Sequence, residues 1–193
     1  RASISAQFPG ERLVIGAGGL KTRSNDTDFR FRPHSAFAHL TGWGSDSEPG
    51  AVLVFEPTAG GHEATVYFRE RAGRDSEEFY ANPAIGEFWI GARPSLAHVA
   101  ADLAVATRGL DEFDHVVDAV DTATLVLREA DASVTERVDH ARIRFAAEQA
   151  LSTNASDAPF SLEVSGSHEP DGELARVVSE LRLVKDEFEQ AQM

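Results

Sequence analysis

The chain has 193 residues, which suits one domain with a sizeable core. Its net charge of −14 disfavours binding to nucleic acid or to an anionic membrane, and the absence of cysteine excludes disulfides and thiolate chemistry. No apolar run approaches the roughly 20 residues of a membrane span and the N-terminus shows no signal-peptide pattern, so we expect a cytoplasmic protein. Because the sequence starts without Met, we expect Arg1 to be an artificial or proteolytic boundary.

The first half of the sequence predicts strands. Short runs of apolar or alternating residues are closed by glycine or proline, as expected for strands of a sheet. The continuous apolar run over residues 51–55 predicts a strand that is covered on both faces. Gly60 and Gly61 suit a hairpin connection to the strand that follows. The predicted strands are residues 13–15, 36–41, 51–55 and 64–68.

The second half of the sequence predicts helices, because apolar residues recur there at helical spacing. Residues 115–117 could form a further strand. Asp121 is expected to cap a helix, with Val120 and Leu125 as its hydrophobic staple, and Asp171 is expected to cap the last helix. The apolar helix positions are Leu96, Val99, Ala100 and Leu103; Val134, Val138, Ala141 and Phe145; and Leu174, Val177, Val178, Leu181 and Phe188.

Strands that precede helices predict an α/β layered domain with a mixed β-sheet flanked by helices. The segment 152–170 is rich in Ser, Pro, Gly and Asp, so it predicts a loop, with a possible short strand at residues 160–164.

Standard catalytic motifs are absent from the sequence. None of the seven histidines stands in a zinc-protease helix motif, and Leu20 occupies a position where a phosphate loop needs glycine. Carboxylates gather at Asp26 and Asp28 and again over residues 111–114. They could hold metal ions only if they converge in space, and solvated turns are the alternative.

Three segments resemble the N-terminal domain of Xaa-Pro aminopeptidases, the aminopeptidase P family. The specificity of the resemblance comes from the order and spacing of the segments. The last segment is also similar to segments of prolidases and creatinases that lead into a catalytic domain. The three are residues 22–32 (TRSNDTDFRFR) running into 37–42 (FAHLTG), residues 87–91 (EFWIG) with Arg93, and residues 180–185 (ELRLVK).

The resemblance implies a parent enzyme that removes an N-terminal residue preceding proline. Its catalytic domain would have the pita-bread fold and hold two manganese ions, with every ligand beyond this chain, so no catalytic or metal-binding residue is assigned here. Residues 1–170 would be a ribonuclease H-like domain without nuclease function. Residues 171–193 would be a helix leading toward a missing C-terminal catalytic domain. The resemblance also implies a dimer or tetramer, with peptides that carry proline second as substrates.

The resemblance further implies three residues at the substrate entrance, namely Trp89, Asp26 and Arg23. The tryptophan that matches Trp89 lines the entrance of a neighbouring subunit, where an aromatic face packs well against proline. The alternative is core packing of the run 88–90. Asp26 would attract the ammonium group of the peptide or pair with Arg23, and the alternative is a turn that Asp26 forms with Asn25.

The favoured hypothesis is thus a non-catalytic domain that is inactive alone. One alternative is a stand-alone binding or scaffold module, whose last helix should have its apolar face covered internally. A patch exposed near Phe188 would instead indicate a missing domain. The other alternative is an independent metal-dependent hydrolase that uses Asp26, Asp28 or the cluster at residues 111–114.

Overall fold

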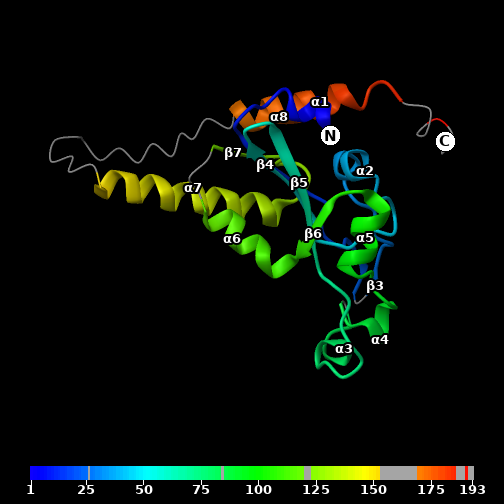
Figure 1. Ribbon diagram of the computed structural model, residues 1–193. Helices are drawn as coiled ribbons and strands as arrows, with labels where there is room; N and C mark the ends of the chain where they lie inside the picture. Colours follow the sequence, from blue (N-terminus) through cyan, green and yellow to red (C-terminus); the bar gives the residue numbers. More distant parts are fainter. Residues whose placement is uncertain (26, 84, 120–122, 153–168, 186–189, 191–193) are drawn as a thin grey trace.

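The computed structural model describes residues 1–25, 27–83, 85–119, 123–152, 169–185 and 190. They form an α/β domain in which a mixed sheet lies between two layers of helices (Figure 1). In this part of the chain, no helix is both long enough and apolar enough to cross a membrane.

The central sheet has five strands in the order β6-β5-β4-β1-β7. Strand β4 pairs antiparallel with β1 and with β5, whereas β7 runs parallel to β1 and β6 runs parallel to β5. A separate hairpin is formed by β2 and β3. The strands are β1 (Arg12–Gly16), β2 (Thr22–Ser24), β3 (Thr27–Asp28), β4 (Val52–Thr58), β5 (Gly61–Phe68), β6 (Ala106–Gly109) and β7 (Thr124–Val126).

Alternating side chains of the sheet face two cores. In β1, Leu13 and Ile15 belong to one core and Val14 to the other, as the period of two in a strand requires. Helices α1, α2, α5 and α8 cover the first face, and α6 and α7 cover the second. The helices are α1 (Ala2–Ser5), α2 (Ser35–Thr41), α3 (Glu78–Ala81), α4 (Glu87–Ile90), α5 (Leu96–Leu103), η1 (Leu110–Glu112), α6 (Phe113–Asp118), α7 (Ala132–Ser152) and α8 (Glu169–Leu181).

The predicted fold class, a mixed sheet flanked by helices, is confirmed. The strands expected at residues 13–15, 51–55 and 64–68 are present as β1, β4 and β5, and Ala59 and Gly60 connect β4 to β5. The four buried residues of β4 over 52–55 confirm that both faces of this strand are covered. Helices α5, α7 and α8 correspond to the three expected helical segments.

The strand expected at residues 36–41 is wrong, because this segment is helix α2. The side chain of His34 accepts a hydrogen bond from the amide of Ala36 and caps the helix, and Gly42 ends it with a left-handed φ of 80°. Only six residues suggested alternation. Their buried members, Phe37 and Leu40 among them, lie on one helical face.

Two further predictions around α6 and β7 are wrong. Residues 115–117 lie in α6, where Phe113 is buried and Val116 and Val117 follow it at helical spacing. Leu125 lies in β7 and pairs with Leu13 of β1, so it is part of a strand and cannot staple a helix. Asp121 and Val120 lie outside the described residues, as do the strand expected at 160–164 and Phe188.

Asp171 is not the cap of α8, since the helix begins at Glu169. Its carboxylate is 2% exposed and accepts hydrogen bonds from the Val126 amide at 2.9 Å and from Arg142 at 2.8 and 2.9 Å. Arg128 donates to Asp171 at 3.2 Å and to Asp139 of α7 at 2.7 Å. Burial alone would raise the pKa of Asp171, but these donors hold the pKa below its ordinary value.

We predict that Asp171→Asn lowers the free energy of unfolding by about 3–5 kcal/mol, because it leaves two arginines beside a neutral group. The depressed pKa of Asp171 also gives stability that is present above about pH 4 and is lost as the pH falls through the lower folded pKa. Urea unfolding of this chain should therefore lose stability in acid, and Asp171→Asn should remove that part of the loss. The exposed Asp111→Asn variant is the control. A cost below about 1 kcal/mol would contradict the prediction.

Candidate functional site

The strand directions bring three long connections to one edge of the sheet. Strands β1, β5, β6 and β7 all end at this edge, and β4 begins there. We call it the loop edge. Residues 17–34 leave it after β1, residues 42–51 approach it before β4, and residues 69–95 leave it after β5. Figure 1 shows β3, α3 and α4 toward the same end of the molecule.

The first connection carries the β2–β3 hairpin. Its two ends are closed by a hydrogen bond from the His34 amide to the Ala17 carbonyl at 2.8 Å. Asn25 adopts a left-handed φ of 37°, which asparagine tolerates at a turn. Arg23 is exposed on β2, and Asp26 lies outside the described residues, so their expected ion pair is not tested.

The third connection is held together by a buried arginine. Arg93 is only 4% exposed, and its guanidinium donates to the Glu70 carbonyl at 2.7 Å and to the Ile85 carbonyl. It also forms an ion pair with Glu78 of α3 at 2.8 Å. One side chain with five donors therefore ties the start of the connection to α3 and to the entrance of α4.

Glu87 and Gly86 complete the packing between α3 and α4. We call the buried charged pair Arg93 and Glu87 the polar centre. The buried carboxylate of Glu87 accepts a hydrogen bond from the Ala72 amide at 2.7 Å and lies 4.0 Å from Arg93. A Cβ on Gly86 would lie 2.8 Å from the Phe79 carbonyl oxygen, closer than real contacts allow. Helices α3 and α4 can therefore approach each other this closely only with glycine at position 86.

Because Arg93 and Glu87 occupy the interior, the large apolar side chains of α3 and α4 face outward. Trp89 is 57% exposed, its indole N–H donates to the Tyr80 carbonyl at 3.1 Å, and its ring lies 5.1 Å from that of Phe88. We call Phe79, Tyr80, Phe88, Trp89 and Ile90 the aromatic patch. The core-packing alternative for the run 88–90 does not hold, since all three residues are exposed. Exposed apolar side chains that gather in this way are typical of interaction surfaces.

The second connection joins the other two. The Gly50 amide donates to the Gly18 carbonyl at 2.8 Å, at the base of the hairpin. Burial raises the pKa of nearby Glu48, whereas the charge of Arg93 lowers it and that of Glu87 raises it. Glu48 thus lies within electrostatic reach of the polar centre under the aromatic patch. The hairpin and the patch therefore lie on connections that share the loop edge.

The other sequence-predicted groups lie apart from one another. Asp28 is exposed on β3, Glu112 pairs with Arg108 at 2.9 Å, and Asp114 pairs with Arg137. Across the described ranges, no three His, Cys, Asp or Glu side chains gather closely enough to hold a metal ion. Among the described residues, the carboxylates singled out from the sequence therefore do not converge on a metal ion.

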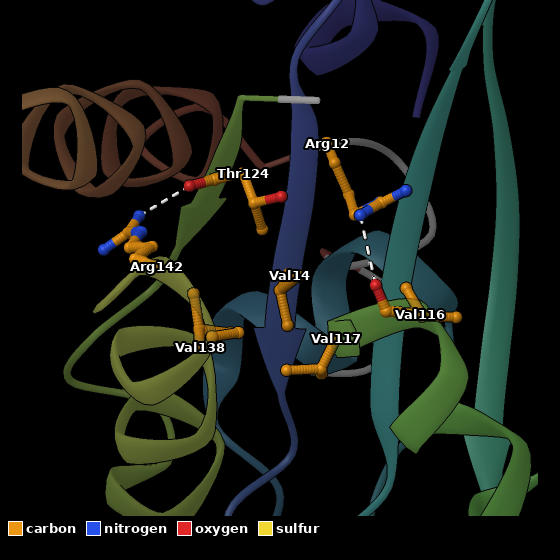
Figure 2. A pocket seen from close by; sticks show the side chains of 8 residues that line it. Arg12, Val14, Val116, Val117, Thr124, Val138 and Arg142 are labelled. Carbon is orange, nitrogen blue, oxygen red and sulfur yellow. Dashed lines mark hydrogen bonds between the residues drawn. The ribbon is translucent and has the colours of Figure 1, made fainter. Parts of the chain in front are cut away.

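A small pocket on the second face of the sheet is also structural. Figure 2 shows its lining by Arg12, Val14, Val138 and neighbouring side chains from β1, α6 and α7. Arg12 donates to the Val116 carbonyl at 3.1 Å and to Glu56 at 2.7 Å, and Arg142 donates to the Thr124 carbonyl at 2.5 Å. Arg12 thus links β1 to α6 and to β4, and Arg142 links α7 to β7.

Glu87 and Arg93 belong to the second segment that carries the family resemblance, but the sequence assigned them no role. The available signal was that a glutamate and an arginine flank a run of large apolar residues. Two opposite charges so placed can pair in the interior of the segment. In the fold these two charged residues are buried, and the apolar run between them is exposed.

Comparison with known proteins gives a consistent result. The family model described as "Aminopeptidase P, N-terminal domain" matches residues 1–127. Xaa-Pro aminopeptidase 1 of Streptomyces coelicolor is 39% identical over 189 residues, which are 98% of this chain and 33% of that protein. Xaa-Pro aminopeptidase 2 of the same organism is 37% identical over 190 residues, 98% of this chain and 34% of that protein. The chain spans about a third of the length of these curated relatives.

Solved structures share the fold. Proline aminopeptidase P II from Yersinia pestis matches with a TM-score of 0.57 and 24% identity, over 77% of this chain and 33% of that chain. Aminopeptidase PepP from Pseudomonas aeruginosa matches with a TM-score of 0.58 and 20% identity, over 77% of this chain and 32% of that chain. At these identities the likeness supports the fold alone.

We predict that Arg93→Met opens residues 69–95 locally. The change leaves the Glu70 and Ile85 carbonyls without their hydrogen-bond donor. Each unsatisfied buried group lowers the stability of the segment by about 1–3 kcal/mol. Amide hydrogen exchange should accelerate by about 10-fold or more in α3 and α4, with β1 and β4 unchanged. Arg74→Met, at an exposed position of the same connection, is the matched control. Equal acceleration in β1 would mean global unfolding and would contradict a local role for Arg93.

Proposed function

Because the chain belongs to the aminopeptidase P N-terminal domain family, we propose that it is the non-catalytic front domain of a manganese-dependent Xaa-Pro aminopeptidase. Such an enzyme removes an N-terminal residue that precedes proline. The observation that carries the proposal is the exposed aromatic patch with Trp89, which lies on a connection at the same sheet edge that the hairpin with Arg23 leaves.

The two parts of the parent divide the work. The C-terminal catalytic domain would hold two manganese ions, which would supply Lewis-acid chemistry to the peptide bond. This chain supplies walls that hold the peptide in place. Trp89 offers an aromatic face to the proline ring, Asp26 attracts the peptide's ammonium group, and Arg23 positions Asp26.

Helix α8 is the proposed link to the catalytic domain, with residues 1–170 as the domain and 171–193 as the segment that leads out of it. Leu174 and Val178 are buried in the first core, so α8 is fixed on the sheet. Leu183 and Val184, which follow the helix, are 77% and 82% exposed. Two adjacent apolar side chains in this position suit a surface that the next domain covers.

The aromatic patch is the proposed oligomer contact. Aromatic residues that stand out from a surface are typical anchors of protein interfaces. In a dimer or tetramer, the patch would lie against a neighbouring subunit and bring Trp89 to that subunit's substrate entrance. We propose that the parent works in the cytoplasm.

The alternative is a stand-alone binding module, and one feature of the structure agrees with it. The apolar face of α8 at Leu174 and Val178 is covered internally, as that alternative expects. The match of 98% of this chain to relatives about three times as long supports the front-domain proposal more strongly. An independent metal-dependent hydrolase has the least support, because Glu112 and Asp114 are paired with arginines.

The first prediction separates these functions. Residues 1–193 alone should release no N-terminal residue from an Xaa-Pro peptide with Mn²⁺, whereas the full-length parent should release it. Release is measured by chromatography of the free amino acid, with EDTA as the control. Release by residues 1–193 would show that a complete active site lies within them. An inactive parent would favour the binding module.

The second prediction concerns Trp89 in the full-length parent. Trp89→Ala should lower kcat/KM for an Xaa-Pro peptide by about 10-fold or more, since a lost aromatic contact costs about 1.5–3 kcal/mol. The melting temperature should change little, because the side chain is exposed. Ile143→Ala, an exposed apolar residue on α7, is the control. Unchanged kinetics with lower thermal stability would contradict the substrate role and leave Trp89 with its contact to Tyr80 within the α3–α4 segment.

A further inference from the structure

The hairpin at the loop edge carries an unusual local charge. Residues 21–32 contain four cationic residues and two acidic ones, a surplus of two positive charges in a chain whose net charge is −14. All four cationic side chains are exposed. The basic hairpin, as we call it, consists of Lys21, Arg23, Arg30 and Arg32.

These cations have no partners within the part of the chain that the structure describes. Other exposed arginines, such as Arg108, Arg144 and Arg176, form ion pairs with carboxylates on the surface. The four cations of the basic hairpin form no hydrogen bond or ion pair through their side chains with any described residue. No described carboxylate therefore pairs with Arg30 or Arg32, whereas Arg23 is already assigned to Asp26 in the proposed function.

The local fold holds these cations together. Phe31 packs against the first core, so Arg30 and Arg32 on either side of it are turned to solvent. The Phe29 amide donates to the Lys21 carbonyl at 2.9 Å, which brings the two strands of the hairpin side by side. At the base of the hairpin, burial lowers the pKa of His34, the charges of Arg182 and Lys21 lower it further, and the charge of Glu129 raises it.

The chemistry that fits this surface is a carboxylate. Guanidinium groups bind carboxylates with paired hydrogen bonds, and Phe29, which is 56% exposed, offers an apolar contact beside them. A peptide carries carboxylates at its C-terminus and on Asp and Glu side chains. A long polyanion is disfavoured by the strongly negative remainder of the chain.

We propose that the basic hairpin is a subsite for a carboxylate of the peptide substrate, so that the parent enzyme prefers acidic Xaa-Pro peptides. The proposal rests on the proposed function, because the peptide must cross the loop edge to reach the hairpin. It assigns Arg30 and Arg32 a role in substrate specificity. This role differs from those proposed for Trp89, which contacts the proline ring, and for Asp26, which attracts the ammonium group.

The experiment measures kcat/KM of the full-length parent for matched peptides. One neutral Xaa-Pro peptide is compared with peptides that carry Glu before the proline or Glu after it, and with a form amidated at the C-terminus. The amidated form tests the terminal carboxylate, and the two Glu peptides test the side-chain positions. The variants are Arg30→Gln/Arg32→Gln and, as a control of equal charge change, Arg108→Gln/Arg176→Gln.

The wild-type parent should favour at least one carboxylate-bearing peptide over its neutral partner. In Arg30→Gln/Arg32→Gln this ratio should fall by about 3- to 10-fold, as two solvent-exposed ion pairs allow. The wild-type ratio should also shrink in high salt, and the control variant should keep it.

An unchanged ratio in Arg30→Gln/Arg32→Gln would overturn the subsite. An equal fall in Arg108→Gln/Arg176→Gln would overturn it as well, because the preference would then come from net charge alone. These outcomes leave the proposed function intact, since neutral Xaa-Pro peptides would still be cleaved. A parent that cleaves no Xaa-Pro peptide would overturn both proposals together.

Discussion

The direction of strand β4 is the constraint on which the rest of the structure depends. Since β4 runs antiparallel between β1 and β5, both neighbouring strands end where β4 begins. The chain must therefore make its long connections at that edge. The hairpin after β1 and the α3–α4 segment after β5 come from distant parts of the sequence, and strand direction brings both to the same edge of the sheet.

Charged groups in the interior then fix what the sheet has brought together. Arg93 organises the α3–α4 segment, and Asp171 joins α8 to β7 and α7 through Arg128 and Arg142. Buried ion pairs add little net stability, but losing one partner is costly, so they strongly favour one geometry. Such fixed geometry suits surfaces that must meet another domain at a defined angle. The aromatic patch and the end of α8 are the two surfaces for which this matters most.

The sequence predicted the parts of the fold whose signal is local. The apolar run of β4 and the helical spacing of α7 were sufficient, because burial on two faces or on one stripe leaves a direct pattern. Segment 36–41 was misassigned because six residues cannot separate a period of two from a period of 3.6. Asp171 looked like a cap because the sequence does not show that an arginine 29 positions earlier faces it.

The candidate site was predictable only in part, for a related physical reason. The family resemblance pointed to Trp89, Asp26 and Arg23, but it could not say that an arginine and a glutamate form the interior beneath the aromatic residues. The exposure of Trp89 follows from the burial of Arg93 and Glu87, which is a property of the folded segment. That no described carboxylate pairs with Arg30 or Arg32 likewise becomes evident only when the partners of the other arginines are known.

The most direct test is hydrogen–deuterium exchange of the isolated chain compared with the full-length parent. A front domain whose loop edge faces the rest of the parent predicts slower exchange in the parent at residues 22–32, at α3 and α4, and after α8. Exchange in α6 and on the outer face of α7 should be the same in both proteins. Equal exchange everywhere, or protection confined to α6 and α7, would contradict the account of the loop edge as the functional surface.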